Sequence, residues 1–255
     1  MRASKSAFAV AMTLTLMAGS VSAVAADPTK VVPFVFVGSA AECGGPAGSR
    51  IVTAAWLGGM GLPDNGGANG VPATANDPHR GLLLSKNGPT TDCSSAGATI
   101  KNPPKTLTEL NFDYRKGGHC GAGAPRFNVT SKAGFTYFFG CVHGEHSPAA
   151  QDAQWEHVTW SQGHGVVFPA SATAPPFVFG STEIKSISII FDEGTGVDGT
   201  SAEDPNGVGL AVLDNISINS VVVRSGQGIA DGNNANRDKD KDDNDQDNDN
   251  GRGND

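Results

Sequence analysis

Four of the chain's six histidines lie in the stretch CVHGEHSPAAQDAQWEHVTWSQGHG, residues 141 to 165. Imidazole nitrogen is a preferred ligand of zinc and copper, and a hairpin could bring three such rings around one ion. We therefore take His143, His146 and His157 as candidate transition-metal ligands. Because their spacing matches no fixed metal-binding motif, ordinary polar loop histidines are the alternative.

A second candidate lies in the run VGLAVLDNISIN, residues 208 to 219. In a regular strand Leu210, Val212, Asp214 and Ile216 share one face, so Asp214 points into the core unless a β-bulge intervenes. A lone buried carboxylate costs several kcal/mol unless it is paired. Something must therefore compensate the charge of Asp214.

Three kinds of partner are available to Asp214. They are an arginine such as Arg50 or Arg126, the backbone amides of a bulge, and a calcium ion shared with Asp192 and Glu193. Calcium is the one cofactor that the sequence indicates, in a structural role.

Trp56, Trp155 and Trp160 are the candidate ligand-binding residues, because an exposed indole can stack on a pyranose ring. Core or edge positions are the alternative for each. Polar residues surround Trp155, so we expect it to be the most exposed of the three. No nucleophile elbow, P-loop or dinucleotide motif is present, and we assign no catalytic residue.

The elements that must position these residues are strands. Runs of four to nine residues rich in Val, Ile, Phe and Thr alternate with Gly, Pro, Asn and Asp clusters, which predicts an all-β, antiparallel β-sandwich of the jelly-roll type. Within residues 108 to 114, Leu110, Phe112 and Tyr114 share one face and the polar residues share the other. The predicted strands are VVPFVFVG, RIVTAAWL, GLLLSK, LTELNFDYR, RFNVTS, GFTYFFGCV, HVTW, GVVF, FVFG, SISIIFDE and VGLAVLDNISINSVVVR.

The chain divides into three segments. Residues 1 to 26 have the charged start, apolar centre and small-residue cleavage site of a secretory signal peptide. Residues 27 to 225 are predicted to form one sandwich domain. Residues 226 to 255 are rich in Asp and Asn and poor in apolar side chains, which predicts a disordered acidic tail.

Four cysteines in an exported chain indicate disulfides. We favour the pairs Cys120 with Cys141 and Cys43 with Cys93, because the strands between the first pair suggest a hairpin that returns the chain. The expected location is extracellular or periplasmic, without a membrane anchor. The formal net charge of −8 argues against nucleic acid as a partner.

Two resemblances add to this interpretation. The segment IIFDEG followed by LAVLDNISIN resembles the closing strands of galactose-binding-like, jelly-roll carbohydrate-binding modules. In that family a carboxylate of the last strand often helps to hold calcium, and loop tips or a concave face bind sugar. The block LNFDYRKGGHCGAGAPRFNVTSKAGFTYFFGCVHG resembles uncharacterised secreted proteins, a resemblance that implies no activity.

We therefore expect a secreted, monomeric, non-catalytic sandwich that binds polysaccharide or a cell-surface glycan. One alternative is a metal-dependent or glycan-cleaving enzyme that uses the region from His143 to His164. The other is a structural protein of an envelope or matrix.

Overall fold

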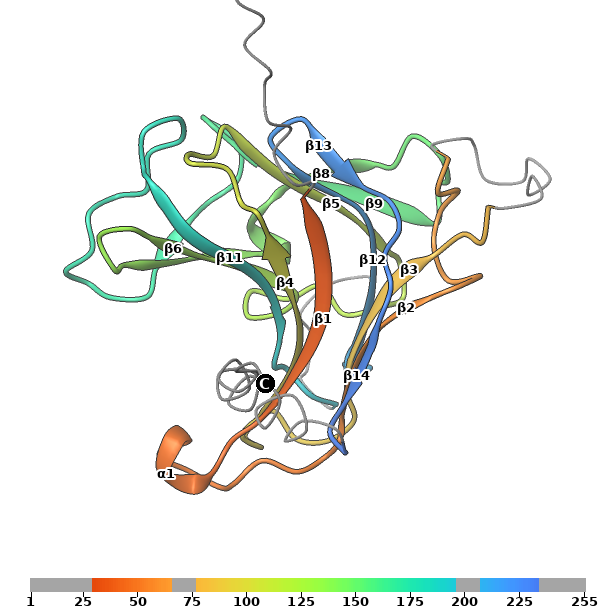
Figure 1. The fold of residues 1–255 in the computed structure, drawn as a ribbon, viewed down its shortest axis with the longest axis vertical. Helices are drawn as coiled ribbons and strands as arrows, with labels where there is room; N and C mark the ends of the chain where they lie inside the picture. The colour runs from red at the N-terminus through yellow and green to blue at the C-terminus, as the bar shows by residue number, and fades with distance from the viewer. Residues whose placement is uncertain (1–28, 66–76, 196–206, 234–255) are drawn as a thin grey trace, which may run out of the picture.

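The computed structural model describes residues 29–65, 77–195 and 207–233. Two antiparallel sheets pack face to face, which confirms the predicted all-β sandwich (Figure 1). The predicted signal peptide and residues 234–255 of the predicted tail lie outside the described residues. Within the described ranges, no helix is long and apolar enough to cross a membrane.

The first sheet has six strands in the spatial order β1-β4-β11-β6-β7-β10. Their bounds are β1 Lys30–Val37, β4 Ser94–Lys101, β11 Ile184–Phe191, β6 Arg126–Ser131, β7 Thr136–Gly140 and β10 Phe168–Pro169.

The second sheet has the order β14-β2-β3-β12-β5-β9-β8, and β13 pairs with β12 beside that path. Two short helices, α1 Ala40–Cys43 and η1 Cys141–His143, accompany the sheets. The bounds of these strands are β14 Ile229–Asp231, β2 Val52–Leu57, β3 Gly81–Lys86, β12 Leu210–Ile218, β5 Glu109–Arg115, β9 Trp155–Ser161, β8 Glu145–Pro148 and β13 Val221–Val223.

Alternation along β5 separates the core from an outer face, as the sequence predicted. Leu110, Phe112 and Tyr114 are buried in the cluster between the two sheets. Asn111 and Asp113 therefore lie on the outer face of the second sheet, because successive strand residues point to opposite sides. This outer face carries the polar residues discussed below.

A β-bulge in β12 changes which residues face the core. The register with β5 shifts between Asp214 and Ser217, and Asn215 has a φ of 43°. Leu213 packs in the core before the bulge and Ile216 packs there after it. Asp214 consequently lies on the outer face. The β-bulge that the sequence left open is therefore present, and the expectation for a regular strand, in which Asp214 points into the core, was wrong.

Both disulfides have the pairing that the sequence favoured. Cys120 is bonded to Cys141, and the hairpin of β6 and β7 lies between them. Cys43 of α1 is bonded to Cys93, which directly precedes β4. Two disulfides are compatible with an exported protein.

Three strands of the structure were not predicted. Strand β4, with the sequence SSAGATIK, is a central strand built from small residues. Strand β8 has the sequence EHSP, which contains none of the Val, Ile, Phe or Thr residues that marked the predicted strands. Strand β14 pairs with β2, so the sandwich continues beyond residue 225 and the predicted tail boundary was too early.

The predicted strand at residues 177 to 180 is irregular in the structure. Its Phe177 and Phe179 nevertheless pack against the core. An apolar run in a loop that lines the core cannot be distinguished from a short buried strand by periodicity.

Candidate functional site

One end of the outer face of the second sheet is covered by an apolar cluster. Trp155 packs there with Leu62, Ala149 and Val212. Leu62 belongs to residues 58–65, the segment that follows β2, which we call the covering segment. Trp155 is only 3% exposed, so the expectation that it is the most accessible indole was wrong. Its ring packs against Leu62 of this covering segment and is therefore not free to stack on a ligand.

The other two tryptophans belong to the core between the sheets. Trp160 is fully buried, and Trp56 is 2% exposed with its indole nitrogen 2.9 Å from the carbonyl oxygen of Val31. Buried indoles present no ring face to a ligand. The predicted stacking platforms at Trp56, Trp155 and Trp160 are therefore absent, and any sugar site must rely on other groups.

Asp214 is fully buried beneath the covering segment and is bonded by backbone amides. Its Oδ2 accepts from the amide of Leu62 and its Oδ1 from the amide of Asn215, both at 2.6 Å. Burial raises the pKa of Asp214 to about 8, although these two bonds act in the opposite direction. Of the three kinds of partner considered from the sequence, the structure supplies the bulge amide and a second amide from a loop.

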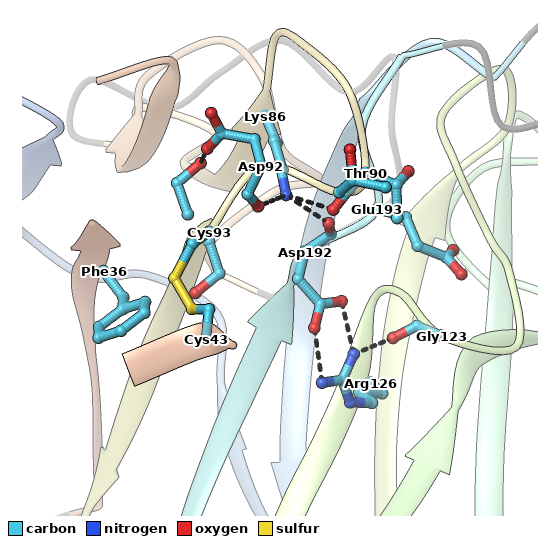
Figure 2. A pocket seen from close by; sticks show the side chains of 13 residues that line it. Phe36, Cys43, Lys86, Thr90, Asp92, Cys93, Gly123, Arg126, Asp192 and Glu193 are labelled. Atoms are coloured by element: carbon cyan, nitrogen blue, oxygen red, sulfur yellow. Dashed lines mark hydrogen bonds and ion pairs between the residues drawn. A yellow bond between two sulfur atoms is a disulfide. The ribbon is translucent and has the colours of Figure 1, made fainter. Parts of the chain in front are cut away.

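A pocket of about 430 Å³ lies at one end of the sandwich, beside a disulfide (Figure 2). The fully buried Lys86, at the end of β3, donates to the carbonyl oxygens of Thr90, Asp92 and Asp192 at 3.0, 2.7 and 2.9 Å. Burial lowers the pKa of Lys86. All three ammonium protons have acceptors, so the arrangement joins three chain segments and leaves no free donor on this side chain.

The carboxylates predicted to share a calcium ion have separate protein partners. Both oxygens of Asp192 accept from the guanidinium of Arg126, at 2.6 and 2.8 Å, as Figure 2 shows. Glu193 lies 2.5 Å from the ring nitrogen Nε2 of His119. Since Asp214 is bonded by amides elsewhere, the structure does not bring the three predicted ligands together.

The three predicted imidazole ligands do not converge either. The ring of His143 packs on Phe168 with centroids 4.8 Å apart, and His146 Nε2 is 2.9 Å from the carbonyl oxygen of Cys141. His157 contacts Asp113 of β5. In the part of the chain that the structure describes, no group of three or more His, Cys, Asp or Glu side chains is arranged to hold a metal.

A groove of about 500 Å³ lies on the outer face of the second sheet. Strands β5, β9 and β12 form its floor, and β8, β13 and the residues that follow them form its sides. We call it the outer groove. Its lining residues are Glu109, Asn111, Asp113, Ser147, Pro148, Ala150, Gln151, His157, Asn215, Ser217, Val222 and Arg224.

Asp113 is the centre of a hydrogen-bond network in the outer groove. Its Oδ1 lies 2.6 Å from Nδ1 of His157, and its Oδ2 accepts from the side-chain amide of Asn215 at 2.6 Å. The carboxylate is 4% exposed and the imidazole 37% exposed. Both oxygens of Asp113 are therefore fixed, while His157 reaches the open part of the groove.

The outer groove also contains polar atoms that have no protein partner. Among the described residues, four buried side-chain polar atoms lack a hydrogen bond, and three of them belong to groove residues. These are the amide oxygens of Asn111 and Asn215 and the Nε of Arg224. Buried polar groups are normally bonded, so these three indicate a polar ligand or ordered water.

The groove and the pocket beside Lys86 thus differ in what they can do. Charged groups in the pocket have partners within the protein, whereas Asn111, Asn215 and Arg224 of the groove each keep one buried polar atom without a partner. Asn111, Asn215 and Arg224 were not predicted as site residues. The one signal in the sequence was the polar face shared by residues 109, 111 and 113.

No family model, curated protein or solved structure matches this chain.

Proposed function

We propose that the protein binds a polyhydroxylated ligand, of the kind that an extracellular glycan presents, in the outer groove. The observation that supports this proposal is the set of unpartnered buried atoms on Asn111, Asn215 and Arg224. A sugar hydroxyl both donates and accepts hydrogen bonds, so a hydroxyl that enters the groove can bond either to an amide oxygen or to a guanidinium N–H.

The setting of the groove agrees with this ligand class. The disulfides and the resemblance of the closing strands to jelly-roll carbohydrate-binding modules favour an exported glycan binder. Mixed charge in the groove, with Glu109 and Asp113 near Arg224 and His157, does not select a strongly anionic polymer. Because no tryptophan stacks there, we expect weak affinity for a single sugar and tighter binding of longer chains.

The test is a glycan array followed by calorimetric titration of the mature, untagged protein. Asn111→Ala removes an amide that faces the groove, and we expect it to weaken binding about five- to tenfold, as the loss of one hydrogen bond would. Asn128→Ala is the matched control, because Asn128 lies on a strand of the opposite sheet. We expect this control to bind like the wild type.

Two results would contradict the proposal. One is the absence of any saturable glycan binding by the wild type. The other is equal loss of affinity in Asn111→Ala and Asn128→Ala, since this would show a general effect on the fold and no role for the groove.

A further inference from the structure

The strand register aligns four side chains across the outer face of the second sheet. Ser147 of β8 is opposite His157 of β9, His157 is opposite Asp113 of β5, and Asp113 is opposite Asp214 of β12. Directly opposed residues in antiparallel strands point to the same face, with Cβ atoms about 4.5–5.5 Å apart. The first three, Ser147, His157 and Asp113, line the outer groove together.

Asp113 is well placed to orient His157. Its carboxylate is buried, its Oδ2 is held by Asn215, and its Oδ1 lies 2.6 Å from Nδ1 of the imidazole. An ionised carboxylate at this distance selects the tautomer with the proton on Nδ1. Nε2 of His157 is then unprotonated, on the side of the ring away from β5.

Ser147 lies on that other side of His157. It is exposed on β8, the edge strand of the sheet. In the described structure no hydrogen bond joins its hydroxyl to His157, and such contacts are often loose without a ligand. Ser147 is exposed and has no side-chain hydrogen bond among the described residues, so its hydroxyl is free to rotate about χ1 toward the imidazole.

We propose that Ser147 and His157 act as nucleophile and general base, positioned by Asp113, and that they hydrolyse acyl esters on hydroxyls of a glycan bound in the outer groove. This inference rests on the proposed function. Ester hydrolysis fits the groove better than glycosidic cleavage, which requires two carboxylates across the scissile bond. Both oxygens of Asp113 are occupied, so Glu109 is the one groove carboxylate left for such a role in the described structure.

The chemistry would follow two steps. The Ser147 hydroxyl oxygen attacks the ester carbonyl carbon while Nε2 of His157 takes its proton, and the carbonyl carbon's bond to the glycan oxygen then breaks as His157 protonates that oxygen. Water, deprotonated by His157, next attacks the acyl-serine and releases the carboxylic acid and the serine hydroxyl. The guanidinium of Arg224, which lines the same groove, supplies the positive charge for the negative oxygen of each tetrahedral intermediate.

The test uses the mature full chain with p-nitrophenyl acetate and an acetylated polysaccharide. Ser147→Ala should lower the hydrolysis rate by at least about 100-fold, and a fluorophosphonate probe should label Ser147 in the wild type. Asp113→Asn should lower kcat and leave KM for the ester nearly unchanged, a split that a merely structural role would not produce. Ser186→Ala, on an exposed position of the opposite sheet, should keep the wild-type rate.

The outcomes separate this inference from the proposed function. Hydrolysis that survives in Ser147→Ala, or no hydrolysis in the wild type, overturns the catalytic inference. In that case weaker glycan binding by Asn111→Ala would still support the groove as a binding site. Hydrolysis that depends on Ser147 in a protein that binds no glycan supports the catalytic residues and overturns the glycan as their substrate. Ser147→Ala that binds deacylated glycan normally but has lost turnover supports both.

Discussion

Asp214 makes the folding stability depend on pH in a direction that can be tested. Its side chain is fully buried, and burial raises its pKa from 3.8 to about 8, with Asp64 and Asp113 adding to the effect. The folded protein therefore binds a proton more tightly at this site than the unfolded chain does. The stabilising contribution is fully present below about pH 4 and is lost as pH rises through about 8.

The magnitude follows from the width of this window. Each pH unit within it lowers the free energy of unfolding by about 1.4 kcal/mol, so raising the pH from 5 to 7 costs about 3 kcal/mol. Asp214→Asn does not titrate and should abolish this slope. Its amide group would face one of the two backbone N–H donors, which should cost about 1–3 kcal/mol at pH 5, where the wild-type side chain is protonated.

The assay is urea unfolding at several pH values between 5 and 7.5, with the wild type, Asp214→Asn and Asp152→Asn. Asp152 is a partly exposed carboxylate that accepts from the amide of Gln154, so its variant should keep the wild-type slope. Histidines contribute equally to all three proteins, and the difference between variants isolates Asp214. A slope in Asp214→Asn equal to that of the wild type would show that Asp214 stays ionised, and the reasoning from burial would be refuted.

Three further predictions concern stability. Lys86→Met leaves three carbonyl groups without the ammonium that joins them, and we expect it to lower the free energy of unfolding by about 3–5 kcal/mol and Tm by about 10 °C. In the same thermal melt the exposed Lys185→Met should change the free energy of unfolding by under about 0.5 kcal/mol. Gly61→Ala places a Cβ 2.4 Å from Oδ2 of Asp214 and should destabilise the covering segment, which is measured as faster proteolysis of that segment. Gly45→Ala is the control, because its Cβ meets no atom within 4 Å, and it should leave the proteolysis rate unchanged. Because the carboxylates expected to bind calcium have separate partners, EDTA should leave Tm unchanged, and one equivalent of calcium by mass spectrometry together with a lower Tm in EDTA would restore the calcium prediction.

The fold class and most strands could be predicted because large apolar side chains mark them. Strand β4 could not, since five of its six buried positions are serine, alanine or glycine. The reason for one of these small residues is visible only in three dimensions: a Cβ at Gly97 would lie 2.7 Å from the ring of Phe34 on β1. The sequence of a strand does not show which neighbour will lie across it.

The candidate site was less predictable than the fold. The face on which Asn111 and Asp113 lie follows from alternation along β5, but the strand order that puts β5 between β9 and β12 does not. His157 was predicted as a metal ligand together with His143 and His146, and in the structure its imidazole contacts Asp113 instead. Its neighbours Asp113 and Ser147 are 44 and 10 positions away in sequence, and strand pairing alone brings them together.

The three carbonyl oxygens around Lys86 determine how this part of the structure depends on dissolved ions. Three such oxygens form a shell that would suit a hard cation from solution, and this chain fills it with an ammonium group of its own. A tethered cation does not dissociate upon dilution, is not extracted by chelators and needs no supply from the medium. The three chain segments that meet at Lys86 are thereby joined without an ion from the surrounding solution.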